Sequence, residues 1–480
     1  MRYSRTYERG RLNVATNSVA VSQIIEATDR SNRWGWIETF VLIQNLSMAL
    51  LFLPGAQEFR IYIRAIPYVS SLGLAFLYYN KGRISRLPPG GELVLLAQLL
   101  LVISLFHPNT HFPAGIAQCI FQFSIIAPIF WVAGEITDQG HLRRILWLFF
   151  LTGAANAVVG LLQVYYPETF MPPSFSKLAL SMNPNAVSSL TYIGAAGEKI
   201  IRPPGLTDLP GGAAIGAIVA GLLGIIFGAQ PKQSAGRRIF CFSMAAVGIS
   251  VLYLTQVRSL LIMLVIAVMA MCLLLVRQGR LLQSGLMASI GITLLVGSFT
   301  WATAIGGKSV SERFTSLINA PVESFQQNRG NFIKYTLDEL LYEYPLGAGV
   351  GRWGMMNLYF GRDDPTQPEP IWVEIQMTGW LLDGGVLMWL FYGGAVIVAL
   401  AYAYRLSIAR TDYTLAYLAG IILCLNFFVF GISLSGPAFN NQLGIQFWFL
   451  TAALYGASRH ALNSTRQENS KLWYQHGSSS

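Results

Sequence analysis

A polar loop between two apolar stretches carries the residue types best suited to chemistry in this chain. It runs from Arg329 to Gly351 and ends in Tyr-Pro-Leu-Gly-Ala-Gly-Val-Gly. An arginine opens an amphipathic stretch that predicts a short helix, and Pro345 ends it because proline cannot continue a helix. Gly347, Gly349 and Gly351 can take positive φ and let a ligand approach the backbone. The loop therefore indicates a binding or catalytic segment.

Two further arginines lie in predicted loops ahead of apolar stretches. Arg202 precedes the run Pro-Pro-Gly-Leu-Thr-Asp-Leu-Pro-Gly-Gly, and Arg258 lies in the short turn Gln-Val-Arg-Ser. A guanidinium binds phosphate oxygens through paired hydrogen bonds and stays charged when partly desolvated. An arginine at the end of a span inside a bundle is a default site candidate, and its alternative role is a snorkelling residue at headgroup level. With Arg329, these residues could stabilise a polyanionic leaving group.

Acidic residues near the same loop offer acid–base chemistry. Glu374 lies just before an apolar stretch, where it is a candidate base for an acceptor hydroxyl. Its alternative role is an acid at headgroup level that a nearby arginine satisfies. Asp338, Glu339 and Glu343 lie on the amphipathic stretch, where a solvated face is expected.

Aromatic residues are frequent in the second loop. Their rings could pack on the C–H surfaces of sugars, and the alternative is an interfacial aromatic belt. The residues concerned are Tyr335, Tyr342, Tyr344, Trp353 and Tyr359.

The composition places these residues in a membrane protein. The chain is 53% hydrophobic and 12% charged, with a mean hydropathy of +0.48, whereas about a quarter of the residues in a soluble domain are charged. Apolar stretches near the length of a bilayer span recur, which predicts an all-α polytopic bundle. The twelve predicted spans are 37–55, 62–80, 91–106, 113–134, 145–165, 211–229, 239–256, 259–276, 283–304, 376–402, 414–436 and 441–458.

The distribution of Lys and Arg predicts the orientation of the bundle. The first 36 residues carry six arginines, and basic residues recur in every second short loop; Arg60 and Arg64 are the exception. Both termini are therefore expected in the cytoplasm. The predicted parts are a cytoplasmic segment 1–36, a membrane domain 37–458 with large outer loops at 166–210 and 305–375, and a loose cytoplasmic tail 459–480.

Charge and cysteine usage narrow the partners and cofactors. The net charge of +10 is expected to face anionic membrane lipid, and no nucleic-acid partner is expected. The four cysteines all fall inside predicted spans without a metal-type spacing, so small apolar fillers are expected. No Asp-x-Asp or histidine cluster stands near the arginines. Chemistry without metal or cofactor is therefore predicted.

The run from Arg329 to Gly351 resembles the signature loop of the O-antigen polymerase and ligase superfamily, the Wzy/WaaL-type membrane glycosyltransferases. That superfamily tends to place an arginine, a glycine and Asn/Asp-Pro-type residues at the end of the first outer loop. The residues of this chain there are Arg202, Gly205, Asp208 and Pro210. Similar proteins often carry an arginine–serine pair at the turn that holds Arg258 and Ser259.

The end of the second loop is similar to the same superfamily. Its acidic residue and following glycine are present as Asp383 and Gly385. In ligase-like members a histidine stands where this chain has Glu374, nine residues before Asp383. This difference favours a polymerase over a ligase.

The resemblance implies specific roles. Catalytic roles fall to Arg258, Arg329 and Glu374. Substrate-binding roles fall to Arg202, Tyr335, Gly347, Gly349, Gly351 and Asp383. The implied reaction moves a glycan from a polyprenyl-pyrophosphate carrier to a sugar hydroxyl of a lipid-linked repeat unit on the outer face. A flippase and a chain-length regulator are expected partners.

Two other functions stay open. One is a ligase that moves a finished glycan from its lipid carrier to another acceptor. The other is a multi-span solute transporter, since putative inorganic-carbon transporters carry a similar loop. Transporters usually show internal repeats, broken spans and ionisable residues near the midplane, whereas the spans predicted here are nearly free of acid.

Overall fold

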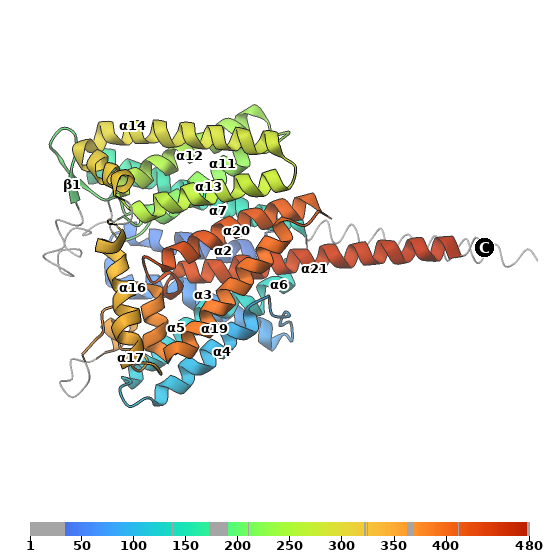
Figure 1. Ribbon diagram of the computed structural model, residues 1–480, viewed down its shortest axis with the longest axis horizontal. Helices are drawn as coiled ribbons and strands as arrows, with labels where there is room; N and C mark the ends of the chain where they lie inside the picture. The colour runs from blue at the N-terminus through green and yellow to red at the C-terminus, as the bar shows by residue number, and fades with distance from the viewer. Residues whose placement is uncertain are drawn as a thin grey trace, which may run out of the picture.

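The computed structural model describes residues 34–136, 138–171, 191–209, 211–320, 323, 325–361, 369–410 and 412–477. These residues are mostly helical, and the strands among them are two short ones. The long helices pack lengthwise into a bundle (Figure 1). Most of the predicted N-terminal segment and part of the first predicted loop lie outside the described residues.

Eight helices among the described residues are long and apolar enough to cross a membrane, so the protein is membrane-embedded. They are Ala56–Asn80, Phe112–Glu135, Gln139–Tyr165, Ala235–Thr255, Arg258–Arg277, Leu281–Thr315, Gln376–Ser407 and Tyr413–Ser433. Three of the other predicted spans correspond to the shorter apolar helices Trp36–Phe52, Gly91–Phe106 and Ala213–Gly228. The predicted count of twelve spans is therefore not confirmed.

The first half of the chain consists of short and long helices in alternation. The helices are α2 (Trp36–Leu46), α3 (Arg60–Asn80), α4 (Gly91–Ile103), α5 (Phe112–Ile126), α6 (Val132–Glu135), α7 (Gln139–Tyr165) and α8 (Pro167–Phe170). Tighter turns adjoin them at η1 (Ser47–Phe52), η2 (Ala56–Phe59), η3 (Ser104–Phe106) and η4 (Ala127–Phe130).

The second half contains the longest helices. The helices of this half are α11 (Ala213–Gly228), α12 (Ala235–Thr255), α13 (Arg258–Arg277), α14 (Leu281–Asn319), α18 (Gly354–Phe360), α19 (Gln376–Ser407), α20 (Tyr413–Ser433) and α21 (Gln442–Gly477), with a single turn at η8 (Ala438–Asn440). A helical run in the second loop comprises η6 (Gln326–Gly330), α16 (Asn331–Tyr335), η7 (Thr336–Leu340) and α17 (Leu341–Glu343).

Local sequence explains where several helices begin and how closely they pack. Asp138 caps α7 by accepting a 2.8 Å hydrogen bond from the backbone N–H of His141, and Asp412 caps α20 in the same way. Small residues let α11 and α12 approach each other. A Cβ at Gly224 or Gly248 would lie 2.6 Å from a carbonyl oxygen of the facing helix.

The C-terminal tail continues the last helix. Residues 459–477 of the predicted tail are helical and belong to α21, which ends at Gly477. The physical reason is local: residues 459–476 contain no Gly or Pro to end a helix. In Figure 1, α21 projects from the end of the bundle opposite to β1 (Thr191–Ile193), α16 and α17. We call the end with β1, α16 and α17 the loop end.

Two long helices are broken at glycines. In α14 the backbone of Gly307 has φ 59° and ψ −148°, and in α19 Gly385 has φ 68° and ψ −162°. Glycine adopts these conformations without the steric penalty that a side chain would bring. Figure 1 shows α14 turning back at the loop end, beside β1. The residues of α14 after Gly307 therefore lie at the loop end of the bundle.

A β-hairpin packs on the break in α14. Strand β1 pairs antiparallel with β2 (Lys199–Ile201), with Tyr192 opposite Ile200. The backbone N–H of Ala195 donates to the Ile305 carbonyl at 2.8 Å, and the Ser309 hydroxyl donates to the Ile193 carbonyl at 2.8 Å. The hairpin and the break thus hold each other in place.

Candidate functional site

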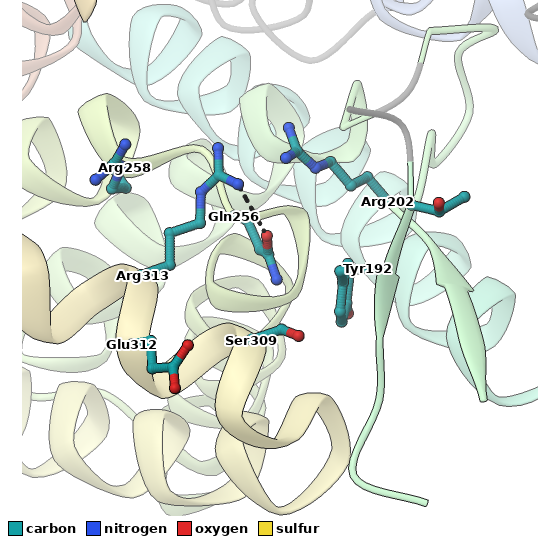
Figure 2. Close-up of a pocket in the computed structure, with 8 residues that line it drawn as sticks. Tyr192, Arg202, Gln256, Arg258, Ser309, Glu312 and Arg313 are labelled. Carbon is teal, nitrogen blue, oxygen red and sulfur yellow. Dashed lines mark hydrogen bonds between the residues drawn. The ribbon is translucent and has the colours of Figure 1, made fainter. Parts of the chain in front are cut away.

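A polar cavity of about 470 Å³ opens between the hairpin and the returning segment of α14. Its walls come from β1, the residue after β2, the α12–α13 turn and α14 (Figure 2). The residues that line it are Thr191, Tyr192, Arg202, Gln256, Arg258, Ser309, Glu312 and Arg313. Its charge is mostly positive.

Each arginine of the cavity is positioned by a local feature of the sequence. Arg202 follows β2 and precedes Pro203, and its carbonyl accepts a 3.2 Å hydrogen bond from the Gly211 N–H. Arg258 is the first residue of α13. Arg313 stands six residues after the Gly307 break, on the segment that turns back over the bundle.

The three guanidiniums are close enough to affect one another. Figure 2 shows the Arg313 guanidinium between those of Arg202 and Arg258. Burial lowers the pKa of Arg202, and the neighbouring positive charge of Arg258 lowers it further. Like charges gathered in one partly buried cavity repel one another, so an anion bound there would relieve the repulsion.

The cavity also holds hydrogen-bonding groups that are buried and unused. Tyr192 is 7% exposed and Gln256 is 3% exposed. The Tyr192 hydroxyl, Gln256 Nε2 and Arg202 Nε have no hydrogen-bond partner among the described residues. Burial raises the pKa of Tyr192, so its hydroxyl stays protonated and can donate. Buried donors without partners are rare in proteins, and a bound ligand would account for them.

The structure brings together two of the arginines that the sequence singled out. Arg202 and Arg258 face the same cavity, whereas Arg329 and Glu374 do not line it. Arg313 was not predicted as a site residue from the sequence, although a signal was present. Gly306 and Gly307 end an apolar run and are followed by charged residues, which is typical of a helix break followed by a polar segment.

Arg329 and Glu374 form an ion pair with each other. Their side chains are 35% and 23% exposed. Glu374 Oε1 also accepts a 2.8 Å hydrogen bond from Trp372 Nε1. This is the second of the two arrangements considered for Glu374, in which an arginine satisfies the acid. A catalytic role for either residue stays a prediction.

The helix predicted after Arg329 is confirmed. Helical backbone runs through η6, α16, η7 and α17, and Tyr344 leaves it immediately before Pro345. The hydroxyls of Thr336 and Thr378 lie 2.6 Å apart and join this helix to α19. Tyr335 is 44% exposed, so its ring is accessible at the loop end.

The glycines of the second loop take positive φ, as predicted, but serve close packing. The φ values of Gly347, Gly349 and Gly351 are 100°, 96° and 81°. A Cβ at Gly347 would lie 3.1 Å from the Leu382 carbonyl oxygen, and one at Gly351 would lie 2.6 Å from the carbonyl carbon of Ala114. Protein backbone thus occupies the side of each glycine that the sequence analysis assigned to a ligand.

Asp383 lies buried within α19, next to its break. Its carboxylate accepts hydrogen bonds from Trp353 Nε1 at 2.8 Å and from Gln118 Nε2 at 3.2 Å. Both Asp383 and Trp353 are almost fully buried. The two residues therefore join the second loop to the bundle core, and Trp353 is not part of an exposed sugar groove.

Asp208 anchors the end of the first loop. Arg64 donates to its two carboxylate oxygens, from Nη2 at 2.8 Å and from Nε at 3.1 Å, and Arg60 pairs with it as well. The carboxylate is buried, with a side-chain exposure of 1%. This pairing accounts for the two arginines that departed from the positive-inside pattern.

Comparison with known proteins adds no family assignment. No family model matches the chain, and no curated protein is similar to it in sequence. Among the described residues, no three His, Cys, Asp or Glu side chains gather into a possible metal site.

Proposed function

We propose that this protein is a membrane glycosyltransferase whose donor is a glycan linked to a lipid pyrophosphate. The observation that carries the proposal is the convergence of Arg202, Arg258 and Arg313 on one cavity at the loop end. A pyrophosphate carries several negative charges on oxygens that a guanidinium can bind in pairs. The cavity lies at an end of the bundle, where a lipid-linked headgroup can reach it from the membrane surface.

The cavity supports a direct displacement. The acceptor hydroxyl attacks the anomeric carbon, and the bond from that carbon to the pyrophosphate oxygen breaks. The electron pair moves onto the pyrophosphate, and the hydroxyl proton passes to a base. Cations fixed beside the leaving oxygens stabilise this transition state more than the ground state. The unused donors of Tyr192 and Gln256 are placed to bind further oxygens.

The proposed reaction is polymerisation on the outer face of a bacterial plasma membrane. Its substrates are polyprenyl-pyrophosphate-linked oligosaccharides, and a flippase and a chain-length regulator are the expected partners. The loop end is the proposed outer end, because the Lys- and Arg-rich short loops belong to the other end under the positive-inside rule. Glu374 at the position of the ligase histidine favours a polymerase over a ligase.

A solute transporter is the second candidate, and one observation favours it. The break in α19 at Gly384 and Gly385 lies next to the buried Asp383, and transporters often combine a broken span with an ionisable residue. Neighbouring protein fills this break, since the N–H of Val386 donates to the Pro345 carbonyl at 3.0 Å. The arginine-lined cavity therefore remains the stronger support.

The test is transfer by the purified, full-length protein. Lipid-linked oligosaccharide extracted from cells that lack the protein serves as both donor and acceptor. Longer lipid-linked glycans and released polyprenyl pyrophosphate are the expected products. Binding of inorganic pyrophosphate is measured in parallel by calorimetry. Absence of transfer by the wild-type protein, together with solute uptake by vesicles that contain it, would overturn the proposal in favour of a transporter.

A further inference from the structure

We infer that Glu312 is the base that takes the proton from the acceptor hydroxyl, an assignment that rests on the proposed function. Glu312 lines the same cavity as the three arginines. It is the one carboxylate among the described residues that line this cavity. Glu374, the base predicted from the sequence, does not line the cavity.

The Glu312 carboxylate and the three guanidiniums lie in different parts of the cavity, which separates the place of the acceptor from that of the donor pyrophosphate. Glu312 and Arg313 are consecutive on the α14 segment after the Gly307 break, so their side chains leave the helix about 100° apart. In Figure 2 the Arg313 guanidinium points toward Arg202 and Arg258, and the Glu312 carboxylate points away from them. A donor pyrophosphate on the guanidiniums thus leaves the Glu312 side of the cavity to the acceptor.

The Glu312 carboxylate is accessible and is not held by an ion pair among the described residues. The contrast with Glu374 is direct, since Arg329 and Trp372 occupy the oxygens of that acid. A general base needs an oxygen within hydrogen-bond reach of the proton that it removes. Because Glu312 lines the cavity, an acceptor hydroxyl bound there can come within that reach.

The step is balanced without any further reactant. A Glu312 oxygen takes the proton of the acceptor hydroxyl while the acceptor oxygen bonds to the anomeric carbon. The bond from that carbon to the pyrophosphate oxygen breaks, and its electron pair moves to the pyrophosphate that the arginines hold. Glu312 then returns the proton to solvent.

The experiment compares Glu312→Gln with the matched variant Glu343→Gln, an exposed acid of α17. The substrate is lipid-linked oligosaccharide from cells that lack the protein. For Glu312→Gln we expect kcat to fall roughly 10²–10⁴-fold with little change in KM for the donor or in binding of inorganic pyrophosphate. Glu343→Gln should keep the wild-type rate. Added formate should partly restore transfer by Glu312→Ala.

The outcomes distinguish this inference from the proposed function. If wild-type protein transfers glycan and Glu312→Gln does so within three-fold of its rate, the inference is overturned and the proposed function stands. A slow Glu312→Gln variant with weakened pyrophosphate binding, or a Glu312→Ala variant that formate does not restore, would indicate a structural role and would also overturn it. If wild-type protein shows no transfer, the proposed function itself fails.

Discussion

Arg313 donates a hydrogen bond of 3.3 Å from Nη1 to the side-chain oxygen of Gln256. Gln256 ends α12 in the left-handed conformation, with φ 56° and ψ 26°. The bond fixes the returning segment of α14 to the turn that carries Arg258. It therefore keeps the Arg313 guanidinium, which was not predicted from the sequence, beside those of Arg202 and Arg258, which were.

The first prediction concerns Arg313. Arg313→Ala should lower the rate of transfer about 10²–10³-fold, because a well-placed donor to the leaving group is lost. Arg313→Lys should restore little, since an ammonium lacks the paired geometry of a guanidinium. Transfer assays and calorimetric titration with inorganic pyrophosphate measure both effects. Arg277→Ala is the control, because Arg277 contacts Tyr404 and does not line the cavity.

The second prediction concerns the pair formed by Arg329 and Glu374. Glu374→Gln should slow transfer only a few-fold, through a less ordered second loop. Arg329→Ala should slow transfer more if the arginine also contacts substrate. The exchanged pair Arg329→Glu with Glu374→Arg should recover the loss of Glu374→Gln if the pair only positions the loop. A loss of 10²-fold or more in kcat for Glu374→Gln, not recovered by the exchange, would instead support the catalytic base.

The third prediction concerns the contact between Pro345, which precedes the glycines of the second loop, and the break in α19 at Gly385. A Cβ at Gly385 would lie 2.3 Å from the Pro345 carbonyl oxygen, where φ is also positive. Gly385→Ala should therefore destabilise the fold by on the order of 3 kcal/mol. Gly285→Ala is the control, since nothing lies within 4 Å of a Cβ there. Thermal unfolding of the two purified variants measures the difference, and equal Tm values would contradict the packing.

The fourth prediction concerns Asp208. Asp208→Asn removes the negative charge that Arg60 and Arg64 share in a buried site. Leaving buried charges without their partner typically costs about 3–5 kcal/mol, so we expect a lower Tm and less protein in the membrane. Detergent-solubilised thermal unfolding is the measurement. A variant as stable as wild type would show that solvent already screens the arginines.

The fifth prediction concerns metal. Because the guanidiniums supply the positive charge for the leaving pyrophosphate, transfer should continue at an unchanged rate in excess EDTA. The assay is run with and without EDTA, followed by addition of Mg²⁺ or Mn²⁺. Activity that EDTA removes and a divalent cation restores would contradict a mechanism based on arginine alone.

Several features of the fold were predictable from the sequence because they depend on local physics. In a bilayer each backbone polar group must find its partner within the protein, so a long apolar stretch becomes a helix wherever it stands. Proline at position 345 ends its helix through its own ring and missing N–H. Arg202 and Arg258 were predictable because each lies in a predicted loop ahead of an apolar stretch.

The sequence by itself determined a helical membrane bundle, a helix after Arg329 and two arginines of the cavity. Only the tertiary structure decided which side chains meet. Gln118 and Asp383 are 265 residues apart and share a hydrogen bond, and Arg313 reaches Gln256 across 57 residues. Such contacts arise because a buried polar group must form its hydrogen bond with whichever group the packing of the helices brings beside it. In the same way, the tertiary structure pairs Glu374 with Arg329 and places Glu312 in the cavity wall.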